Sequence, residues 1–332
     1  MLRCLLSLML LSWSTGHAQV FDLDQFEQLF RPRLRLEGRL LPEVMTDDRS
    51  GTYADRSLHA VMTFPIHSRF KVDAQLDLKA KNIGELLKNG LRVRASQVMG
   101  SLRYGLREVR FDPLLGGPRT LHTASIGALG ISLTRKFRIL FWSLNMNVSE
   151  EDRTLARSVP RFGGVLGKMK VSGARRQFLY GVALGISDGL TLPVPFIGGS
   201  VPMGRSWSFN YVLPLQLSTT CKLGPSTRLI TGAGLDGARS GIEVSGVRAN
   251  INHAGLRLFA SVRHRINRYF VLRAELGYLA RQRVDLDGAP GEAASMPSLL
   301  MPGPVVNIGV NVLFGESVLQ RILDDILAPR PQ

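Results

Sequence analysis

The fold is decided by a stretch of strict alternation, Phe70-Lys71-Val72-Asp73-Ala74-Gln75-Leu76-Asp77-Leu78-Lys79, in which every even position is apolar and every odd position is polar. Successive side chains of a β-strand point to opposite faces, so the pattern predicts a strand with one apolar and one polar face. The same period of two predicts further strands at residues 33–40, 121–133, 137–148, 255–265, 269–284 and 305–314, with weaker signals at 93–106, 160–171 and 191–202. Helical patterning is nearly absent between these segments.

The length of these segments indicates the kind of sheet. At about eight to twelve residues they exceed the five or six residues that are usual for a strand of a soluble protein. They match the nine to eleven residues that a tilted strand needs to cross a bilayer. The sequence therefore predicts an all-β fold, a closed antiparallel up-and-down transmembrane β-barrel over residues 33–314. We expect about twelve strands, within a range of about ten to fourteen.

Connections of two kinds separate the predicted strands. Four short basic turns, each ending on an aromatic residue, lie at His67–Phe70, Thr134–Phe137, Gly204–Trp207 and Asn267–Phe270. Longer polar stretches, predicted to be extracellular loops, lie at 46–56, 107–118, 149–160, 237–250 and 285–304. A membrane barrel has tight periplasmic turns with aromatic residues at the interface beside them, although aromatics also favour strand starts in general. The candidate interface aromatics are Phe70, Phe137, Trp207, Tyr269 and Phe270.

The amino terminus has the pattern of a secretory signal peptide. Arg3 precedes an apolar run over residues 5–13, and Gly16-His17-Ala18 provides small residues for cleavage, so residues 1–18 are predicted to be removed. Cleavage takes away Cys4 and leaves Cys221 alone, which excludes an intramolecular disulfide. Short amphipathic helices are expected at residues 19–32 and 315–332, flanking the barrel. The sequence does not decide whether the second helix lies at the periplasmic mouth or in the lumen.

The chain of 332 residues has a net charge of +16, and 34 of its 42 basic residues are arginine. The arginines are scattered at alternating strand positions instead of forming one basic face, so we expect no nucleic-acid partner. Three interpretations remain open. Arginines could line a lumen that favours anions, could pair with lipid phosphates at the rims, or could be neutralised by carboxylates inside a wet barrel. The candidate lumen or rim anion contacts are Arg257, Arg263, Arg265, Arg273, Arg281 and Arg283.

Motifs for catalysis or cofactor binding are weak. Residues 232–237 match the dinucleotide fingerprint G-x-G-x-x-G, but a turn is expected at 238–242 where that fingerprint requires a helix. His122 and Ser125 share a predicted strand, yet their spacing of three points them to opposite faces. No histidines stand at metal-ligand spacing. We therefore expect no catalytic residues, no cofactor and no metal.

The segment from Pro193 to Arg283 resembles a family of outer-membrane β-barrel proteins of unknown function in Gram-negative bacteria. The resemblance is carried by residues 195–199, 205–214, 234–237 and 273–281. It implies the fold and the location and brings no catalytic motif with it.

These observations together predict an exported outer-membrane protein that is not an enzyme. The first hypothesis is a narrow or plugged pore, or a binding barrel, for small and anionic solutes. The alternatives are a structural anchor within an envelope assembly and a lipid-modifying barrel enzyme. The expected partners are outer-membrane lipids, with small solutes or envelope proteins beside them.

Overall fold

The computed structural model describes residues 31–74, 91–112, 114–133, 138–151, 159–172, 176–187, 190–288 and 298–314. The predicted signal peptide and C-terminal helix, and all but two residues of the predicted N-terminal helical segment, lie outside these ranges. Within them the secondary structure is entirely β, and no helix is long and apolar enough to cross a membrane.

Fifteen strands follow one another along the chain: β1 (Arg33–Met45), β2 (Thr52–Ala74), β3 (Leu91–Asp112), β4 (Arg119–Leu133), β5 (Arg138–Glu150), β6 (Arg161–Ser172), β7 (Arg176–Ser187), β8 (Leu190–Pro202), β9 (Trp207–Leu213), β10 (Gln216–Lys222), β11 (Thr227–Val244), β12 (Val247–Arg265), β13 (Phe270–Asp287), β14 (Ser298–Leu300) and β15 (Gly303–Leu313). The period of two in the sequence explains them, because one face of each strand meets the interior and the other does not. The weaker signals at 93–106, 160–171 and 191–202 correspond to β3, β6 and β8.

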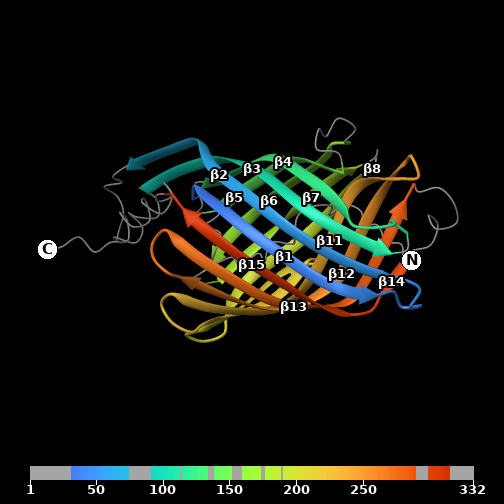
Figure 1. The fold of residues 1–332 in the computed structure, drawn as a ribbon. Coiled ribbons are helices and arrows are strands. Elements are labelled where there is room, and N and C mark those ends of the chain that lie inside the picture. Colours follow the sequence, from blue (N-terminus) through green and yellow to red (C-terminus); the bar gives the residue numbers. More distant parts are fainter. Residues whose placement is uncertain are drawn as a thin grey trace.

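The strands form one closed barrel. From β1 to β13 each strand pairs antiparallel with the next, and β1 pairs with β15 from Arg33↔Leu313 to Leu40↔Val306, which closes the wall (Figure 1). β14 pairs with residues 282–284 of β13, and β15 pairs with residues 270–279 of the same strand. β14 and β15 therefore follow one another along β13 and count as one strand of the wall. The barrel therefore has 14 strands, which confirms the predicted fold class, with two strands more than the expected twelve.

The two ends of the barrel differ in their connections. Arg33 and Leu313 lie at one end, called here the terminal end, together with four-residue turns at 203–206, 223–226 and 266–269. At the opposite end, called the loop end, β1 joins β2 through residues 46–51 and β11 joins β12 through Ser245-Gly246, both with positive φ. The predicted turns Gly204–Trp207 and Asn267–Phe270 are confirmed, whereas Thr134–Phe137 lies outside the described residues.

The loops predicted at 46–56 and 107–118 are shorter than expected, because β2 begins at Thr52 and β3 continues to Asp112. Two other predicted connections are wrong. Residues 67–70 lie inside β2, which continues to Ala74 and pairs with β3 past a register shift between Pro65 and His67. Residues 237–250 were expected to be a loop, with a turn at 238–242. Instead β11 continues to Val244 and β12 begins at Val247, paired throughout from Gly237↔Ala254 to Val244↔Val247. The Asp-Gly turn signal was overridden by this pairing.

Apolar residues occupy both sides of the wall. On the inner side they form two main clusters, one near the loop end around Tyr53, Phe111 and Ile251, and one on β3 to β9 around Met99, Phe141 and Phe196. On the outer side, large apolar side chains are exposed on every described strand except β11. A sheet with apolar side chains on both faces can be stable only if both faces are kept from water.

Candidate functional site

The interior near the loop end is shaped by unequal strand lengths. β9 and β10 have seven residues each, whereas β11 has 18. β10 pairs with β11 from Lys222↔Arg228 to Gln216↔Gly234 and no further. Beyond Gly234, the Leu235 amide still donates to the Leu215 carbonyl at 3.0 Å, after which strand pairing of β11 continues through β12 alone. The other edge of this part of β11 must find partners for its polar backbone groups elsewhere.

Residues Asp236–Val244 of β11, called here the lumen closure, find those partners across the barrel. The Arg239 carbonyl accepts a hydrogen bond from Arg161 of β6 at 2.7 Å, and the Glu243 amide donates to Glu151, just after β5, at 3.2 Å. The Ser149 hydroxyl of β5 donates to Ser240 at 2.8 Å. Since β5 and β11 are six places apart in the order of the sheet, these bonds cross the lumen.

Two ion pairs reinforce the closure. Arg39 of β1 donates to both carboxylate oxygens of Asp236, at 3.0 and 2.6 Å. Arg107 of β3 donates to Asp55 of β2 at 2.7 and 3.0 Å and to Ser240 at 3.4 Å. All four charged side chains are buried, with at most 6% exposed. Paired, doubly hydrogen-bonded guanidinium groups of this kind are the form in which buried charge is tolerated.

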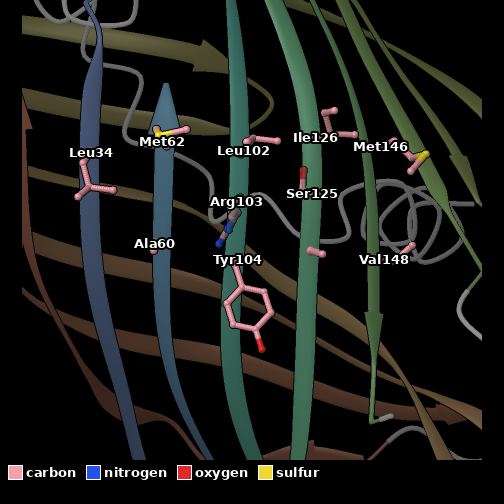
Figure 2. A pocket seen from close by; sticks show the side chains of 11 residues that line it. Leu34, Ala60, Met62, Leu102, Arg103, Tyr104, Ser125, Ile126, Met146 and Val148 are labelled. Carbon is pink, nitrogen blue, oxygen red and sulfur yellow. The ribbon is translucent and has the colours of Figure 1, made fainter. Parts of the chain in front are cut away.

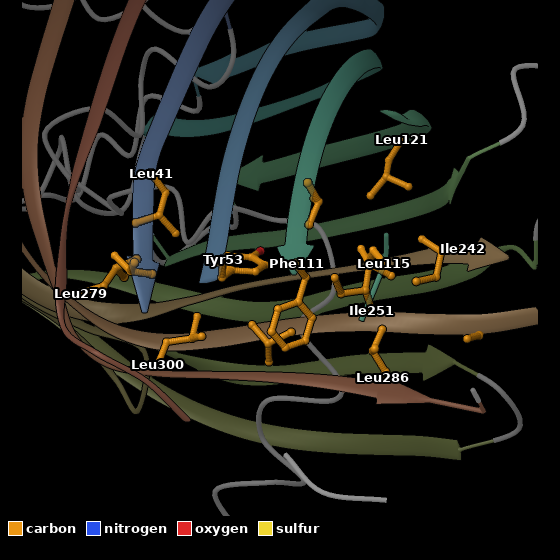
Figure 3. Packing of buried hydrophobic residues seen from close by; sticks show 14 of the residues in the cluster. Leu41, Tyr53, Phe111, Leu115, Leu121, Ile242, Ile251, Leu279, Leu286 and Leu300 are labelled. Atoms are coloured by element: carbon orange, nitrogen blue, oxygen red, sulfur yellow. The ribbon is translucent and has the colours of Figure 1, made fainter. Parts of the chain in front are cut away.

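An apolar layer lies on the loop-end side of these ion pairs. Side chains from β1 to β4 meet side chains from β11 to β15 in one buried cluster, shown in Figure 3. Tyr53 links the two layers, because its ring stacks on His253 at 5.2 Å while its hydroxyl accepts a hydrogen bond from Arg107 at 3.0 Å. The barrel described here is therefore closed toward its loop end by contacts between opposite walls.

Glycine makes the close approach possible. Residues 239–242 are buried without alternation, so both faces of the closure are covered. A Cβ atom on Gly241 would collide with the Glu150 carboxylate of β5. Gly232, Gly234 and Gly237 of the fingerprint-like motif lie in the same strand, and β11 continues as a strand where a dinucleotide site needs a helix. The motif is a feature of strand packing.

The six candidate arginines fall into three environments. Arg257 and Arg273 both donate to Glu275, at 2.9 and 2.5 Å, and Arg263 is buried on the same inner face of β12. Arg281 is exposed and Arg283 pairs with Asp285 at 2.8 Å, both on the opposite face of β13. Arg265 is exposed at the terminal end of β12. Of the three interpretations, neutralisation of the arginines by carboxylates thus applies to Arg257, Arg273 and Arg283.

The candidate interface aromatics are placed only in part. Trp207, Tyr269 and Phe270 are exposed beside the turns of the terminal end, at 48%, 43% and 41% of their surface. Phe70 lies in β2 with its side chain outside the description, and Phe137 lies outside the described residues.

The outer face carries an apolar hollow over β1 to β5 (Figure 2). Its volume is about 440 Å³, and it exists because small residues, Ala60 and Ala124, stand between large exposed ones such as Met62 and Ile126. At its side the Tyr104 hydroxyl and His122 Nδ1 are 2.9 Å apart. The imidazole of His122, which the sequence placed near Ser125, thus forms its hydrogen bond with Tyr104. Over the described ranges, no group of three or more metal-ligating side chains occurs.

Sequence reasoning missed the residues that close the lumen, among them Asp55, Arg107 and Asp236. A signal was present: each is a charged residue at an inward position of an alternating strand. What the sequence does not show is which arginine meets which carboxylate, because Arg39 and Asp236 are 197 positions apart.

No family model and no curated protein sequence matches the chain. Solved structures with similar folds include an outer membrane channel of Pseudomonas putida F1 (10% identity, 86% of this chain and 96% of that chain, TM-score 0.40). Others are the β domain of the Bordetella autotransporter BrkA (11%, 86% and 99%, TM-score 0.34) and the Acinetobacter baumannii outer membrane protein Omp33 (10%, 86% and 99%, TM-score 0.32). All are Gram-negative barrel proteins, and similarities this distant say nothing of a solute.

Proposed function

We propose that this protein is an outer-membrane β-barrel that acts as a gated pore for small solutes, shut in the described state by the lumen closure. The observation that carries the proposal is the set of hydrogen bonds and ion pairs that join β11 to β1, β5 and β6 across the interior.

The outer surface supports membrane insertion. Its exposed apolar side chains include Leu58, Leu144, Leu166, Leu276 and Ile308, each more than half exposed. Monomeric soluble proteins rarely expose so much apolar surface to water, whereas the acyl chains of a bilayer would cover such a surface. The hollow over β1 to β5 suits the acyl chains of outer-membrane lipids. The turns at the terminal end would then face the periplasm, beside Trp207 and Tyr269.

Gating is supported by the way the closure is attached. One edge of Asp236–Val244 pairs with β12, and its other contacts are made mainly by side chains. Side-chain contacts can break while the backbone hydrogen bonds between paired strands stay intact. The lumen closure is therefore the part of the wall whose movement requires the least free energy.

The charge of the interior supports anions as the favoured solutes. Among the residues that the structure describes, six arginines and four carboxylates are buried, and Arg33, Arg35, Arg103 and Arg273 add half-buried positive charge on the inner face against the half-buried Glu37. Rings of basic side chains select anions in pores. In a salt gradient, the reversal potential of the open pore should therefore lie closer to the equilibrium potential of the anion than to that of the cation.

A reversible lock tests the gate. Ser149 and Ser240 have their hydroxyl oxygens 2.8 Å apart on opposite walls, so Ser149→Cys with Ser240→Cys, in a Cys221→Ser background, should form a disulfide on oxidation. In planar bilayers under voltage, the oxidised variant should show no channel openings, and reduction with dithiothreitol should restore them.

The matched control places the same chemistry where no lumen is crossed. Thr219 and Thr231 lie opposite each other on the neighbouring strands β10 and β11, with hydroxyl oxygens 2.8 Å apart. Thr219→Cys with Thr231→Cys should conduct whether oxidised or reduced. Openings that persist in the oxidised Ser149–Ser240 variant would refute the gate. A barrel that never conducts, reduced or wild-type, would favour the structural anchor instead.

A further inference from the structure

The outer face of strands β6 and β7 changes in chemistry along its length. From the loop end to the terminal end, the outward pairs are Phe162↔Ile186, Gly164↔Leu184, Leu166↔Val182, Lys168↔Tyr180 and Lys170↔Phe178. The first three pairs are apolar, the last two join a lysine to an aromatic ring, and the exposed Arg176 lies beyond them. A lipid presents its acyl chains, its interfacial region and its phosphate in the same order.

The two lysines point away from the interior. Met169 lies between them and is buried in the cluster on β3 to β9, so Lys168 and Lys170 lie on the opposite face, where both are exposed. The aromatic rings of β7 have their centroids 6.0 Å apart on that face. We propose that an anionic glycerophospholipid binds here, at a headgroup site made of Lys168, Lys170, Arg176, Phe178 and Tyr180.

Acidic residues are scarce in this part of the sequence. From Arg153 to Leu235 there is one acidic residue, Asp188, which follows the loop end of β7. On β5, the other neighbour of β6, the one acidic residue is Glu150, at the loop end of that strand. Strands β5 to β8 therefore bring no carboxylate to the terminal end, where the three cations of the headgroup site lie. In a membrane, the counter-charge at this level is the phosphate of a lipid.

The position of the lysines along the strand fits a headgroup. Lys168 is four residues from Ser172, where β6 ends, which is about 13 Å along the strand at the usual rise per residue. A lysine at this depth lays its methylene groups along apolar surface and places its ammonium group among the headgroups. Tyr180 belongs to the same level, because tyrosine prefers a site with one apolar and one wet side.

Three cations select the class of headgroup. The phosphodiester of a phosphatidylglycerol carries a negative charge with no amine beside it, whereas a phosphatidylethanolamine carries an ammonium group that the lysines and Arg176 repel. Each basic residue near an anionic lipid strengthens its binding by roughly fivefold. We therefore expect a preference for phosphatidylglycerol of about tenfold or more.

The headgroup site rests on the membrane insertion proposed above and is independent of the gate. Trp142 of β5 provides a reporter beside it. Trp142 pairs with Leu166, and Leu140, two residues away, pairs with Lys168. A Cβ atom on Gly130 would collide with the indole ring, so the ring lies over that glycine on the outer face. In a chain with Trp207→Phe and without the predicted signal peptide, Trp142 is the one remaining tryptophan.

The full-length mature protein with Trp207→Phe is refolded into vesicles of phosphatidylcholine. These vesicles contain a rising fraction of either phosphatidylglycerol or phosphatidylethanolamine with brominated acyl chains, which quench tryptophan fluorescence at short range. Half-maximal quenching of Trp142 should need about tenfold less phosphatidylglycerol than phosphatidylethanolamine. Equal quenching by the two lipids would overturn the site and leave insertion intact. No quenching by either lipid would overturn both.

Variants separate the headgroup site from the net charge of the terminal end. Lys168→Gln with Lys170→Gln should bring the two quenching curves together, whereas Lys168→Arg with Lys170→Arg should keep them apart. Arg205→Gln with Arg268→Gln removes the same charge from exposed positions in the turns at 203–206 and 266–269 and should leave the preference unchanged. A preference that survives in the lysine-to-glutamine variant would refute the headgroup site.

Discussion

Glu275 shows how single residues hold the interior together. Its side chain is fully buried and accepts hydrogen bonds from Arg257 at 2.9 Å, Arg273 at 2.5 Å and Asn307 at 2.7 Å. One carboxylate therefore accepts hydrogen bonds from two guanidinium groups, on β12 and β13, and from an amide on β15. The side chain of Arg257 also lies over the ring of Phe259 at 5.2 Å, a cation–π contact.

Replacing this carboxylate should be costly. Glu275→Gln keeps the size of the side chain but leaves the buried Arg257 and the half-buried Arg273 without their counter-charge, so we expect a loss of about 3–5 kcal/mol in the free energy of unfolding. The measurement is urea unfolding in detergent followed by the fluorescence of Trp142 and Trp207. Asn307→Ala, which removes one hydrogen bond to the same carboxylate, should cost about 1.5–3 kcal/mol. Equal costs for the two variants would contradict this account.

The arginine positions show how far the sequence could be read at individual residues. Alternation placed Arg257, Arg263 and Arg273 on the polar face of their strands, and the structure has them on the inner face. The same reasoning could not separate them from Arg281 and Arg283. An irregularity in the β12–β13 register, between Leu256 and Arg257, changes the face of β13 on which later residues lie. A one-residue shift of this kind reverses every side chain beyond it and leaves no mark in the composition.

Strand β11 carries the main departure from regular barrel geometry, and its cause is the short hairpin beside it. β10 leaves β11 after Gly234, so the unpaired edge beyond it bends to the opposite wall. Strand identity was predictable here because apolar and polar residues alternate over local distances. The inward path was not, because it depends on Ser149 and Arg161, which are 91 and 78 positions from their partners in β11.

A larger residue at Gly241 should prevent the closure from seating. The Cβ and methyl groups of Gly241→Val would overlap the Glu150 carboxylate, which could move aside only by giving up its ion pair with Arg248, so we expect steady conductance without voltage and a loss of about 1–3 kcal/mol in stability. Conductance in planar bilayers and urea unfolding measure the two effects. The control is Gly38→Val in β1, where an added Cβ meets nothing within 4 Å. A Gly241→Val barrel that stays as silent as Gly38→Val would argue against the closure as the gate.

The whole molecule combines an apolar exterior with a charged, closed interior. Alternation predicts both faces at once, which is why fold class and membrane location could be proposed from the sequence. It does not predict the number of strands, because β9 and β10 are too short to show a clear pattern. Nor does it predict that the lumen is shut, since that depends on which inward residues meet across the barrel.

Membrane insertion makes a depth-dependent prediction that a soluble barrel does not share. Leu144 lies midway along β5 and Leu223 lies in the turn after β10 at the terminal end, and their side chains are almost equally exposed, at 62% and 60%. In lipid bilayers, Leu144→Arg should cost about 2–4 kcal/mol of unfolding free energy and Leu223→Arg about 0–1 kcal/mol, because an arginine near the interface reaches water. Urea unfolding in vesicles of defined thickness measures both variants. In water, arginine at either exposed position would be nearly neutral, so similar small costs would mean that this surface faces solvent and the barrel is not inserted.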